Sequence, residues 1–265
     1  ASVELARAEH VTTITMANAG RRNALNAELL QGLIDAIEQA GRDGTRAVII
    51  RADPGVSIWS AGHDIDELPR DGSDPLAWTN PLEGLLRAVR KAPMPVICAV
   101  EGSVWGGACN LVVACDLVVA TRTSTFAITP AKLGIPYNSA GLGHFTGALP
   151  VNIAKEMLFT ALPLTAEDLA RVGLINRLVA DEPAMTNAAV ELAERISSLA
   201  PLSIRAMKAE MNALIDARHL TSDLFEHLTS LRRDAWASAD YREGLDSFAE
   251  RRPPNFTGDV PSRRA

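Results

Sequence analysis

The chain has 265 residues, of which 47% are hydrophobic and 22% are charged, and its formal net charge is −6. This composition supplies one sizeable core and argues against disorder and against a nucleic-acid surface, which usually gathers Lys and Arg in clusters. The three cysteines lie in one apolar stretch and form no C-x-x-C pair, so we expect buried thiols in place of a disulfide framework.

The sequence also carries no sign of a membrane or export segment. The first residues show no basic region followed by an apolar one, so no signal peptide is expected. The longest apolar stretch, residues 94–120, is interrupted by acids, an asparagine and several glycines, which a bilayer span would tolerate poorly. We therefore expect a soluble cytoplasmic protein.

The first half of the chain alternates between strand and helix patterns. Residues 10–16 alternate and are rich in β-branched side chains, which predicts a strand, and Asn26 is placed to cap a following helix. The other elements expected here are helices over 27–40, 75–91 and 107–115, strands over 46–50, 95–100 and 117–120, and a loop over 53–73. Such alternation is typical of an α/β sheet with crossover connections.

Helical patterns dominate the second half. The expected helices cover residues 151–160, 166–172, 183–199, 202–217, 222–236 and 240–250. We therefore expect an α/β core over residues 1–190 and a helical C-terminal region over residues 191–265, which would pack on the core or on another subunit.

Two glycine-bearing loops stand out as candidates for chemistry. The first is Ser60-Ala61-Gly62-His63-Asp64-Ile65, and the second, residues 101–110, contains Gly106-Gly107 at the start of a helix. Glycine lets backbone approach a ligand, and the first N–H groups of a helix have no intrahelical partner, so the Gly107 N–H suits an oxyanion; a turn without a ligand fits the pattern as well. His63 lacks the partners of a metal site or a serine triad, so its backbone N–H is the expected contribution.

These loops resemble the crotonase (enoyl-CoA hydratase/isomerase) superfamily. The resemblance rests on residues 61–65, on Gly106-Gly107 with its flanks, on Ala114-Cys115-Asp116-Leu117 and on Asn23-Ala24-Leu25-Asn26. It implies an α/β fold of repeated ββα units with a helical C-terminal trimerisation region, and an assembly that is a homo-trimer or a dimer of trimers. It also implies an acyl-CoA thioester substrate whose oxygen is held by the backbone N–H groups of His63 and Gly107.

The same resemblance implies the remaining site residues. No metal and no separate cofactor are expected, because coenzyme A is part of the substrate. The substrate-binding residues that it implies are Ala24, Leu25, Ala61, Asp64, Ile65, Gly106, Asn110, Thr129 and Arg251. Arg251 would serve the coenzyme A end, and Arg21-Arg22 could meet its phosphates or be a solvated pair.

Missing acids narrow the reaction. Hydratases of this superfamily use two glutamates, and the corresponding positions here are Asn110 and a residue near Pro130, neither of which is a general base near neutral pH. Hydration and isomerisation are therefore disfavoured. Decarboxylation of a malonyl-type thioester needs no such base, because loss of CO2 itself leaves the electron pair that an oxyanion hole stabilises.

Tyr137 is the candidate that would orient the departing carboxylate, since a phenol donates a hydrogen bond without adding positive charge. On position alone a structural tyrosine fits equally well. The segments 103–108, 123–126, 133–138 and 254–256 resemble the decarboxylases of this superfamily, which implies conversion of methylmalonyl-CoA to propionyl-CoA and CO2, with His63, Gly107 and Tyr137 as catalytic residues.

Several alternatives stay open at this stage. An enoyl-CoA hydratase or isomerase and a non-catalytic acyl-CoA-binding protein are the rivals, and the acidic charge balance argues against RNA binding. The sequence does not choose between malonyl-, methylmalonyl- and ethylmalonyl-CoA. It shows no acid to protonate the enolate, for which water and Tyr137 are candidates. His144 is expected at the surface or as a helix cap.

Overall fold

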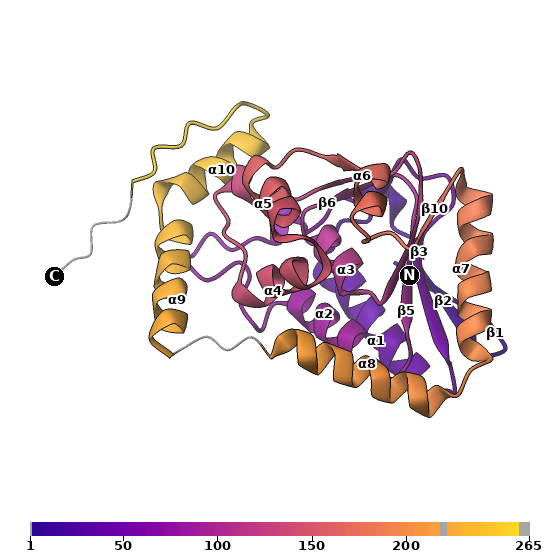
Figure 1. Ribbon diagram of the computed structural model, residues 1–265. Helices are drawn as coiled ribbons and strands as arrows, with labels where there is room; N and C mark the ends of the chain where they lie inside the picture. The colour runs from indigo at the N-terminus through magenta and orange to yellow at the C-terminus, as the bar shows by residue number, and fades with distance from the viewer. Residues whose placement is uncertain (1, 218–221, 260–265) are drawn as a thin grey trace.

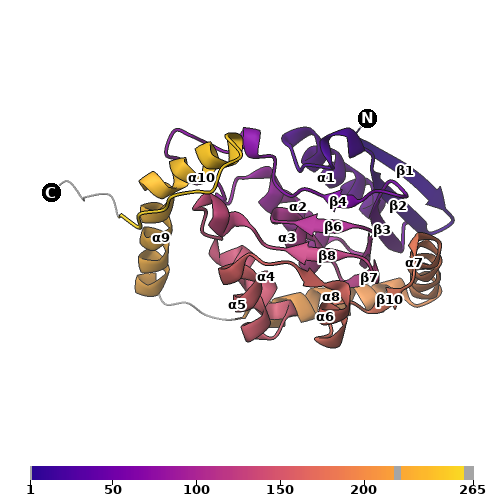
Figure 2. The same ribbon diagram turned by 90° about the horizontal axis from the view of Figure 1, so that it is seen from above.

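The computed structural model describes residues 2–217 and 222–259. Its core repeats one unit three times: a strand of a large sheet, a short strand of a second sheet, and a helix (Figures 1 and 2). The three units are β3 (Ala47–Ala52), β4 (Ile58–Ser60) and α2 (Pro81–Lys91); β5 (Val96–Val100), β6 (Ser103–Trp105) and α3 (Gly107–Ala114); and β7 (Leu117–Thr121), β8 (Thr125–Ala127) and α4 (Ser139–Ala148). The expected ββα architecture is confirmed.

The large sheet has six strands in the order β1-β2-β3-β5-β7-β10. Only the hairpin of β1 (Val3–Ala8) and β2 (Val11–Met16) is antiparallel, and the pairs from β2 to β10 (Arg177–Val179) are parallel. The small sheet, β4-β6-β8-β9, is parallel except for β9 (Leu164–Thr165). Parallel pairing within both sheets places the ends of successive strands, and the loops that follow them, along the same edges.

Helices cover both faces of the large sheet, which is why its inner strands read as unbroken apolar runs. Along β3, Val48 and Ile50 face a core shared with α1 (Ala27–Arg42), α2 and α3. Ala47 and Ile49 face the other side, where they pack with Met185, Ala189 and Ala193 of α7 (Glu182–Ser197). In Figure 1, α7 stands alone against that outer face.

Capping residues set the helix bounds. The Asn26 side chain accepts the Leu29 N–H at 2.9 Å and begins α1, as expected. Asn80 does the same for Leu82, so α2 begins at Pro81 and not at residue 75. Near the C-terminal half, Thr165 and Asp168 form a reciprocal capping box at the start of α6 (Ala166–Arg171).

The expectation of a plain loop over residues 53–73 was wrong, because the segment contains β4 and a short 3-10 turn. The short strands β6 and β8 were also missed, since three residues are too few to show periodicity. Helix α4 was missed because its glycines (Gly141, Gly143 and Gly147) lower its intrinsic helical preference.

The remaining helices are α5 (Val151–Thr160), α8 (Pro201–Asp216), α9 (Ser222–Trp236) and α10 (Ala239–Ala249). The expected boundary between residues 190 and 191 falls inside α7, which packs on the core sheet. Helix α8 begins at Pro201, one residue before the expected start at residue 202. Over residues 2–217 and 222–259, no helix has both the length and the apolar character that a bilayer crossing requires.

Candidate functional site

The two glycine loops pack directly on each other. Gly62 has a φ of +82°, and a Cβ at this position would lie 2.4 Å from the Trp105 carbonyl oxygen and 3.2 Å from the Gly107 nitrogen. Any side chain would therefore separate the loops, in addition to straining the backbone. Glycine at residue 62 allows the turn before His63 to rest against the turn before α3.

This contact brings two unpaired backbone donors together. Gly107 is the first residue of α3, so its N–H has no intrahelical acceptor. No backbone acceptor among the described residues pairs with the His63 N–H. A Cβ on Gly107 would lie 3.7 Å from the His63 nitrogen, which shows how near the two residues are. Two such donors beside the positive end of a helix form the geometry of an oxyanion hole.

The early loop holds this arrangement in place. Leu25 forms a parallel bridge with His63: its N–H donates to the Gly62 carbonyl at 2.8 Å, and its carbonyl accepts the Asp64 N–H at 3.4 Å. The Ala61 N–H donates to the Arg22 carbonyl. Leu25 is fully buried, so its observed role is to position the first loop.

The neighbouring predicted residues have structural contacts of their own. The buried Asp64 carboxylate accepts the Asp66 N–H and lies 3.3 Å from the Arg21 guanidinium, so Arg21 is engaged by the protein. Ala24 and Ile65 are half-buried on either side of the Leu25–His63 bridge. Their contact with a substrate stays a prediction.

Gly106 and Thr129 border the second loop. Gly106 takes a φ of +53° with a ψ of −122°, a conformation that favours glycine, and its N–H donates to the Ala127 carbonyl. A Cβ on Gly106 would lie 3.6 Å from the Thr129 hydroxyl oxygen, so Thr129 lies beside the Gly106-Gly107 turn. Pro130 follows as the first residue of a short 3-10 helix, where the family pattern would place an acid.

Orphaned polar atoms gather at this site. Among the described residues, the buried side-chain nitrogens and oxygens without a hydrogen-bond partner are His63 Nδ1, Asn110 Nδ2, Tyr137 Oη and Arg232 Nε. Three of these belong to residues that the sequence assigned to the site. Folded proteins pair nearly all buried polar atoms, so this concentration points to a ligand as the missing partner.

Tyr137 and Asn110 lie together around Gly141 of α4. A Cβ on Gly141 would lie 2.8 Å from Tyr137 Cδ1 and 3.0 Å from Asn110 Nδ2. The Tyr137 ring also packs edge-on against Phe145, with ring centroids 5.5 Å apart. Burial, and after it the nearby Cys109 and Glu83, raises the pKa of Tyr137 well above its usual value, so the phenol stays a neutral donor.

A chain of polar contacts holds the Asn110 amide. Asn110 Oδ1 lies 3.1 Å from His144 Nδ1, His144 Nε2 lies 3.2 Å from Arg90, and Arg90 pairs with Asp216 at 2.9 Å. Burial and the Arg90 charge lower the pKa of His144 to about 4. A neutral His144 with Nδ1–H donating and Nε2 accepting satisfies both contacts, and it turns Asn110 Nδ2–H away from itself. The expectation of a surface or capping His144 was wrong, because α4 places its ring between Asn110 and Arg90 in this series of polar contacts.

Glu83 is the site residue that sequence reasoning missed. Its side chain is buried, and its Oε1 accepts a hydrogen bond of 2.5 Å from Asn138, the residue after Tyr137. Burial raises the pKa of Glu83 above its usual value, although Asn138, Arg87 and Arg232 oppose that rise. One signal was available: Glu83 precedes Leu86 by one helical turn and therefore borders the apolar stripe of α2.

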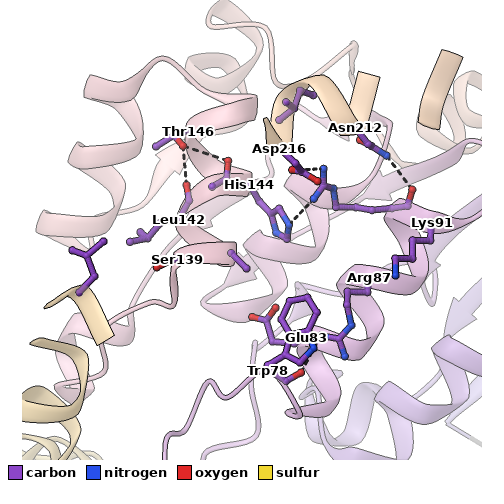
Figure 3. Close-up of a pocket in the computed structure, with 15 residues that line it drawn as sticks. Trp78, Glu83, Arg87, Lys91, Ser139, Leu142, His144, Thr146, Asn212 and Asp216 are labelled. Atoms are coloured by element: carbon purple, nitrogen blue, oxygen red, sulfur yellow. Dashed lines mark hydrogen bonds and ion pairs between the residues drawn. The ribbon is translucent and has the colours of Figure 1, made fainter. Parts of the chain in front are cut away.

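Glu83 opens onto a cavity of about 590 Å³ between α2, α4 and α8. Figure 3 shows its carboxyl group pointing into this space, which Ser139 and His144 also line. Ser139 and Leu142 are shared with an adjoining cavity of about 340 Å³ that Tyr137 lines. Glu83 and Tyr137 thus line neighbouring cavities.

Arg251 belongs to neither glycine loop and follows the end of α10. It is exposed beyond the end of α10, and its side chain forms no hydrogen bond or ion pair with any described residue. A role toward the coenzyme A end stays a prediction. Within residues 2–217 and 222–259, no three His, Cys, Asp or Glu side chains are grouped as ligands for a metal ion.

Comparisons with known proteins match both the fold and the loops. The sequence pattern of the family described as "Enoyl-CoA hydratase/isomerase" matches residues 6–259. The chain is 42% identical over 242 residues to the methylmalonyl-CoA decarboxylase of Escherichia coli (strain K12), covering 91% of this chain and 92% of that protein. It is 32% identical over 265 residues to the carnitinyl-CoA dehydratase of Salmonella paratyphi A, covering 97% and 98%.

A solved structure agrees with these matches. The structure of "Methylmalonyl-CoA decarboxylase in complex with 2-nitronate-propionyl-CoA" superimposes with a TM-score of 0.95 at 39% identity, covering 98% of this chain and 99% of that one. The match extends through the ββα core, both glycine loops and the C-terminal helices. The chain belongs to the enoyl-CoA hydratase/isomerase family, the crotonase superfamily.

Proposed function

We propose that this protein is a carboxy-lyase that converts methylmalonyl-CoA to propionyl-CoA and CO2. The observation that carries the proposal is the pair of unpaired N–H groups at His63 and Gly107. It is joined by the absence of an acid at Asn110, which has an amide side chain, and at Pro130. Such a site stabilises an enolate but lacks the two acids that hydration uses.

The reaction breaks the bond between the α-carbon and the carboxylate carbon. The bonding electron pair moves to the α-carbon and is delocalised onto the thioester oxygen, where the two N–H groups stabilise the negative charge. Removing one such donor typically costs about 3–4 kcal/mol of transition-state stabilisation.

Neutral donors suit the carboxylate that leaves. A cation would stabilise the substrate carboxylate more than the transition state, in which that charge has moved to the thioester. Tyr137 Oη and Asn110 Nδ2 are both unpaired, buried and uncharged. We assign them the role of orienting the carboxylate perpendicular to the thioester plane.

The relatives support the same choice. The Escherichia coli protein with 42% identity is named a methylmalonyl-CoA decarboxylase, and the superimposed structure of a methylmalonyl-CoA decarboxylase holds 2-nitronate-propionyl-CoA. Within the proposal, coenzyme A enters as part of the substrate and no further cofactor or metal takes part. Thr129 beside Gly106, and Arg251, are assigned to substrate binding.

Hydration of an enoyl-CoA is the second candidate. The match to a carnitinyl-CoA dehydratase and the buried acid Glu83 favour it. A hydratase needs two acids to activate and deliver water, however, and the two positions that supply them in this family hold Asn110 and Pro130.

Mass spectrometry of the products tests the proposal. Purified protein is incubated with methylmalonyl-CoA in one tube and with crotonyl-CoA in another. We expect propionyl-CoA in the first and no hydrated product in the second. Hydration in the second tube without propionyl-CoA in the first would replace the decarboxylase with the hydratase. Acyl-CoA binding without turnover in either tube would support a binding protein.

A second experiment tests the role of Tyr137. Tyr137→Phe removes the donor and keeps the ring against Phe145, so we expect the decarboxylation rate to fall at least tenfold, which corresponds to about 1.4 kcal/mol of barrier. Acyl-CoA affinity should change little. A rate within about twofold of the unmodified enzyme would remove Tyr137 from the mechanism.

A further inference from the structure

We propose that Glu83 is the acid that protonates the α-carbon of the enolate. This inference rests on the proposed function, in which an enolate forms and must take up one proton at carbon. It assigns a catalytic residue at a position that the pattern of family acids leaves unmarked.

Two contacts describe the position of Glu83: one is made by its neighbour Leu82, and the other by Glu83 itself. Its neighbour Leu82 reaches the oxyanion hole, since a Cβ on Gly107 would lie 2.8 Å from Leu82 Cδ2. Glu83 itself is bonded to Asn138, which follows Tyr137 in the chain. The first turn of α2, which carries Glu83, therefore contacts the Gly107 turn through Leu82 and the segment after Tyr137 through Asn138. Within the proposal, we place the α-carbon of the bound substrate beside this turn, between the thioester oxygen at Gly107 and the carboxylate at Tyr137.

Asn138 fixes the direction of the carboxyl group. Its amide donates to Glu83 Oε1 at 2.5 Å and to the Leu76 carbonyl at 2.9 Å, and its Oδ1 accepts the Gly141 N–H at 2.6 Å. Each group of the Asn138 amide is therefore used. With Oε1 anchored in this way, the carboxyl group of Glu83 borders the cavity (Figure 3).

The surroundings of this carboxyl group shift its pKa in the direction that favours the protonated form. Burial raises the pKa of Glu83 and Asp74 adds to the rise, whereas Asn138, Arg87 and Arg232 act against it. Both cations have other partners: Arg87 lies over the Trp78 ring at 4.0 Å, and Arg232 pairs with Asp74 at 2.7 Å. Arg90 and Asp216 lie across the same cavity and pair with each other.

Other groups near the site are poorer proton donors. Burial raises the pKa of Cys109 to about 12 and raises that of Tyr137 further from neutrality. His144, with a pKa of about 4, is neutral at pH 7 and its Nδ1–H faces Asn110. A carboxyl whose pKa is raised toward neutrality is a more effective acid at that pH than any of these groups.

The step balances as follows. CO2 leaves, the O–H bond of Glu83 breaks, and the electron pair of the enolate forms a new C–H bond at the α-carbon as the thioester carbonyl is restored. Glu83 is left as a carboxylate and regains a proton from solvent through the cavity, so one turnover consumes one proton. A protonated Glu83 also avoids repelling the carboxylate of the incoming substrate.

The reverse proton transfer provides a test that does not need decarboxylation. In D2O, an ionised Glu83 should remove an α-proton from bound propionyl-CoA and return deuterium, which mass spectrometry detects as a mass increase. Glu83→Gln keeps an oxygen for Asn138 to donate to but carries no exchangeable acid. We expect it to slow the exchange at least 100-fold, with binding of propionyl-CoA within twofold of the unmodified enzyme. Glu156→Gln, on the exposed side of α5, is the matched control and should exchange normally.

The pH dependence of the unmodified enzyme gives a second measurement, independent of any variant. Because the exchange needs ionised Glu83, its rate should rise with pH through an inflection above the usual glutamate value of 4.5 and then level off. Normal exchange in Glu83→Gln, a pH-independent rate, or no exchange by an enzyme that binds propionyl-CoA would each overturn the assignment.

Failure of the proposed function would look different. An enzyme that exchanges propionyl-CoA through Glu83 but releases no CO2 from methylmalonyl-CoA would refute the decarboxylase and retain the acid. If the unmodified enzyme releases CO2 from methylmalonyl-CoA and Glu83→Gln still exchanges the α-proton of propionyl-CoA, the decarboxylase is retained and Glu83 is refuted as the acid.

Discussion

Gly107 acts at the residue scale through its backbone N–H, which only a substitution by proline removes. Its N–H is the first of α3 and is left unpaired by the helix. Its lack of a Cβ also matters, because Leu82 Cδ2 lies only 2.8 Å from where that atom would be. These two properties can be separated by substitution.

Gly107→Pro removes the N–H, and the first helical position is the one where proline fits best. We expect a folded protein whose kcat for decarboxylation falls about 10²–10³-fold, the usual effect of losing one oxyanion donor. Gly107→Ala is the control, since it brings a similar contact with Leu82 and keeps the N–H. Equal losses in the two variants would mean that crowding, and not the missing donor, limits the rate.

His144 makes stability depend on pH at the same scale. Its pKa is about 4 in the folded protein and about 6.5 when unfolded, so the unfolded chain binds more protons between these values. The free energy of unfolding should therefore fall as the pH drops from about 6.5 to about 4, by up to about 3 kcal/mol from this group. In His144→Gln, the free energy of unfolding should fall less between pH 7 and pH 4.5 than in the unmodified protein. Urea denaturation at the two pH values measures this difference. An unchanged difference between the two pH values would contradict the assignment.

The sequence indicated the two glycine turns of the site more completely than its side-chain contacts. The donors of His63 and Gly107 depend on local turns, which Gly62 and Gly106-Gly107 mark directly. Glu83 and His144 were missed because their roles come from packing: helix α2 brings Glu83 to Asn138, 55 residues away, and α4 brings His144 to Asn110. Neither spacing is visible in a single sequence.

At the scale of elements, a buried lysine helps to attach α8 to the core. Lys208 Nζ donates to the Val89 and Met94 carbonyls at 2.9 and 3.0 Å and to the Asp116 carboxylate at 2.7 Å. Asp116 also accepts the Val96 N–H at the start of β5. This explains the family-like acid at residue 116 as a structural contact that joins α8 to the large sheet.

Lys208→Met should therefore lower the free energy of unfolding by about 1–3 kcal/mol, because the carbonyls of the buried residues Val89 and Met94 lose their donor. Urea denaturation measures the change. Lys155→Met, on the exposed side of α5, removes the same charge without a buried partner and should change stability by no more than about 0.5 kcal/mol. A similarly small effect at Lys208 would show that water replaces the lysine.

Elements with strong local signals were predicted well, and elements defined by pairing were not. Helices α5 and α9 have the expected bounds, and α3 and α7 differ by one or two residues. The short strands β4, β6 and β8 exist only because each pairs with a neighbour in the second sheet. That sheet was invisible in the sequence although it carries the loops of the site.

At the scale of the whole molecule, the C-terminal helices leave a broad apolar surface. The exposed large side chains on α8 and α9 include Leu202, Met207, Met211, Leu214, Phe225 and Leu231. Large exposed apolar patches usually mark an interaction surface. The family resemblance implies that further copies of the chain cover it.

We expect size-exclusion chromatography with light scattering to give a trimer or a hexamer of the 28.3 kDa chain. Leu214→Lys should reduce the measured mass, because a charge placed in an apolar interface is costly to bury. Lys155→Met, outside this surface, should leave the mass unchanged. A monomer at micromolar concentration would contradict the expectation.

The contact between the two glycine loops has a consequence for hydrogen exchange. The amides of Leu25 and Gly106 are held by the Gly62 and Ala127 carbonyls, so their hydrogens exchange only when the loops separate. The amides of His63 and Gly107 have no such partner and can exchange while the loops stay closed. A thioester oxygen that accepts both would slow these two amides and leave their neighbours unchanged. The ligand-free protein thus contains, in two backbone hydrogens, its own reporter of an occupied oxyanion hole.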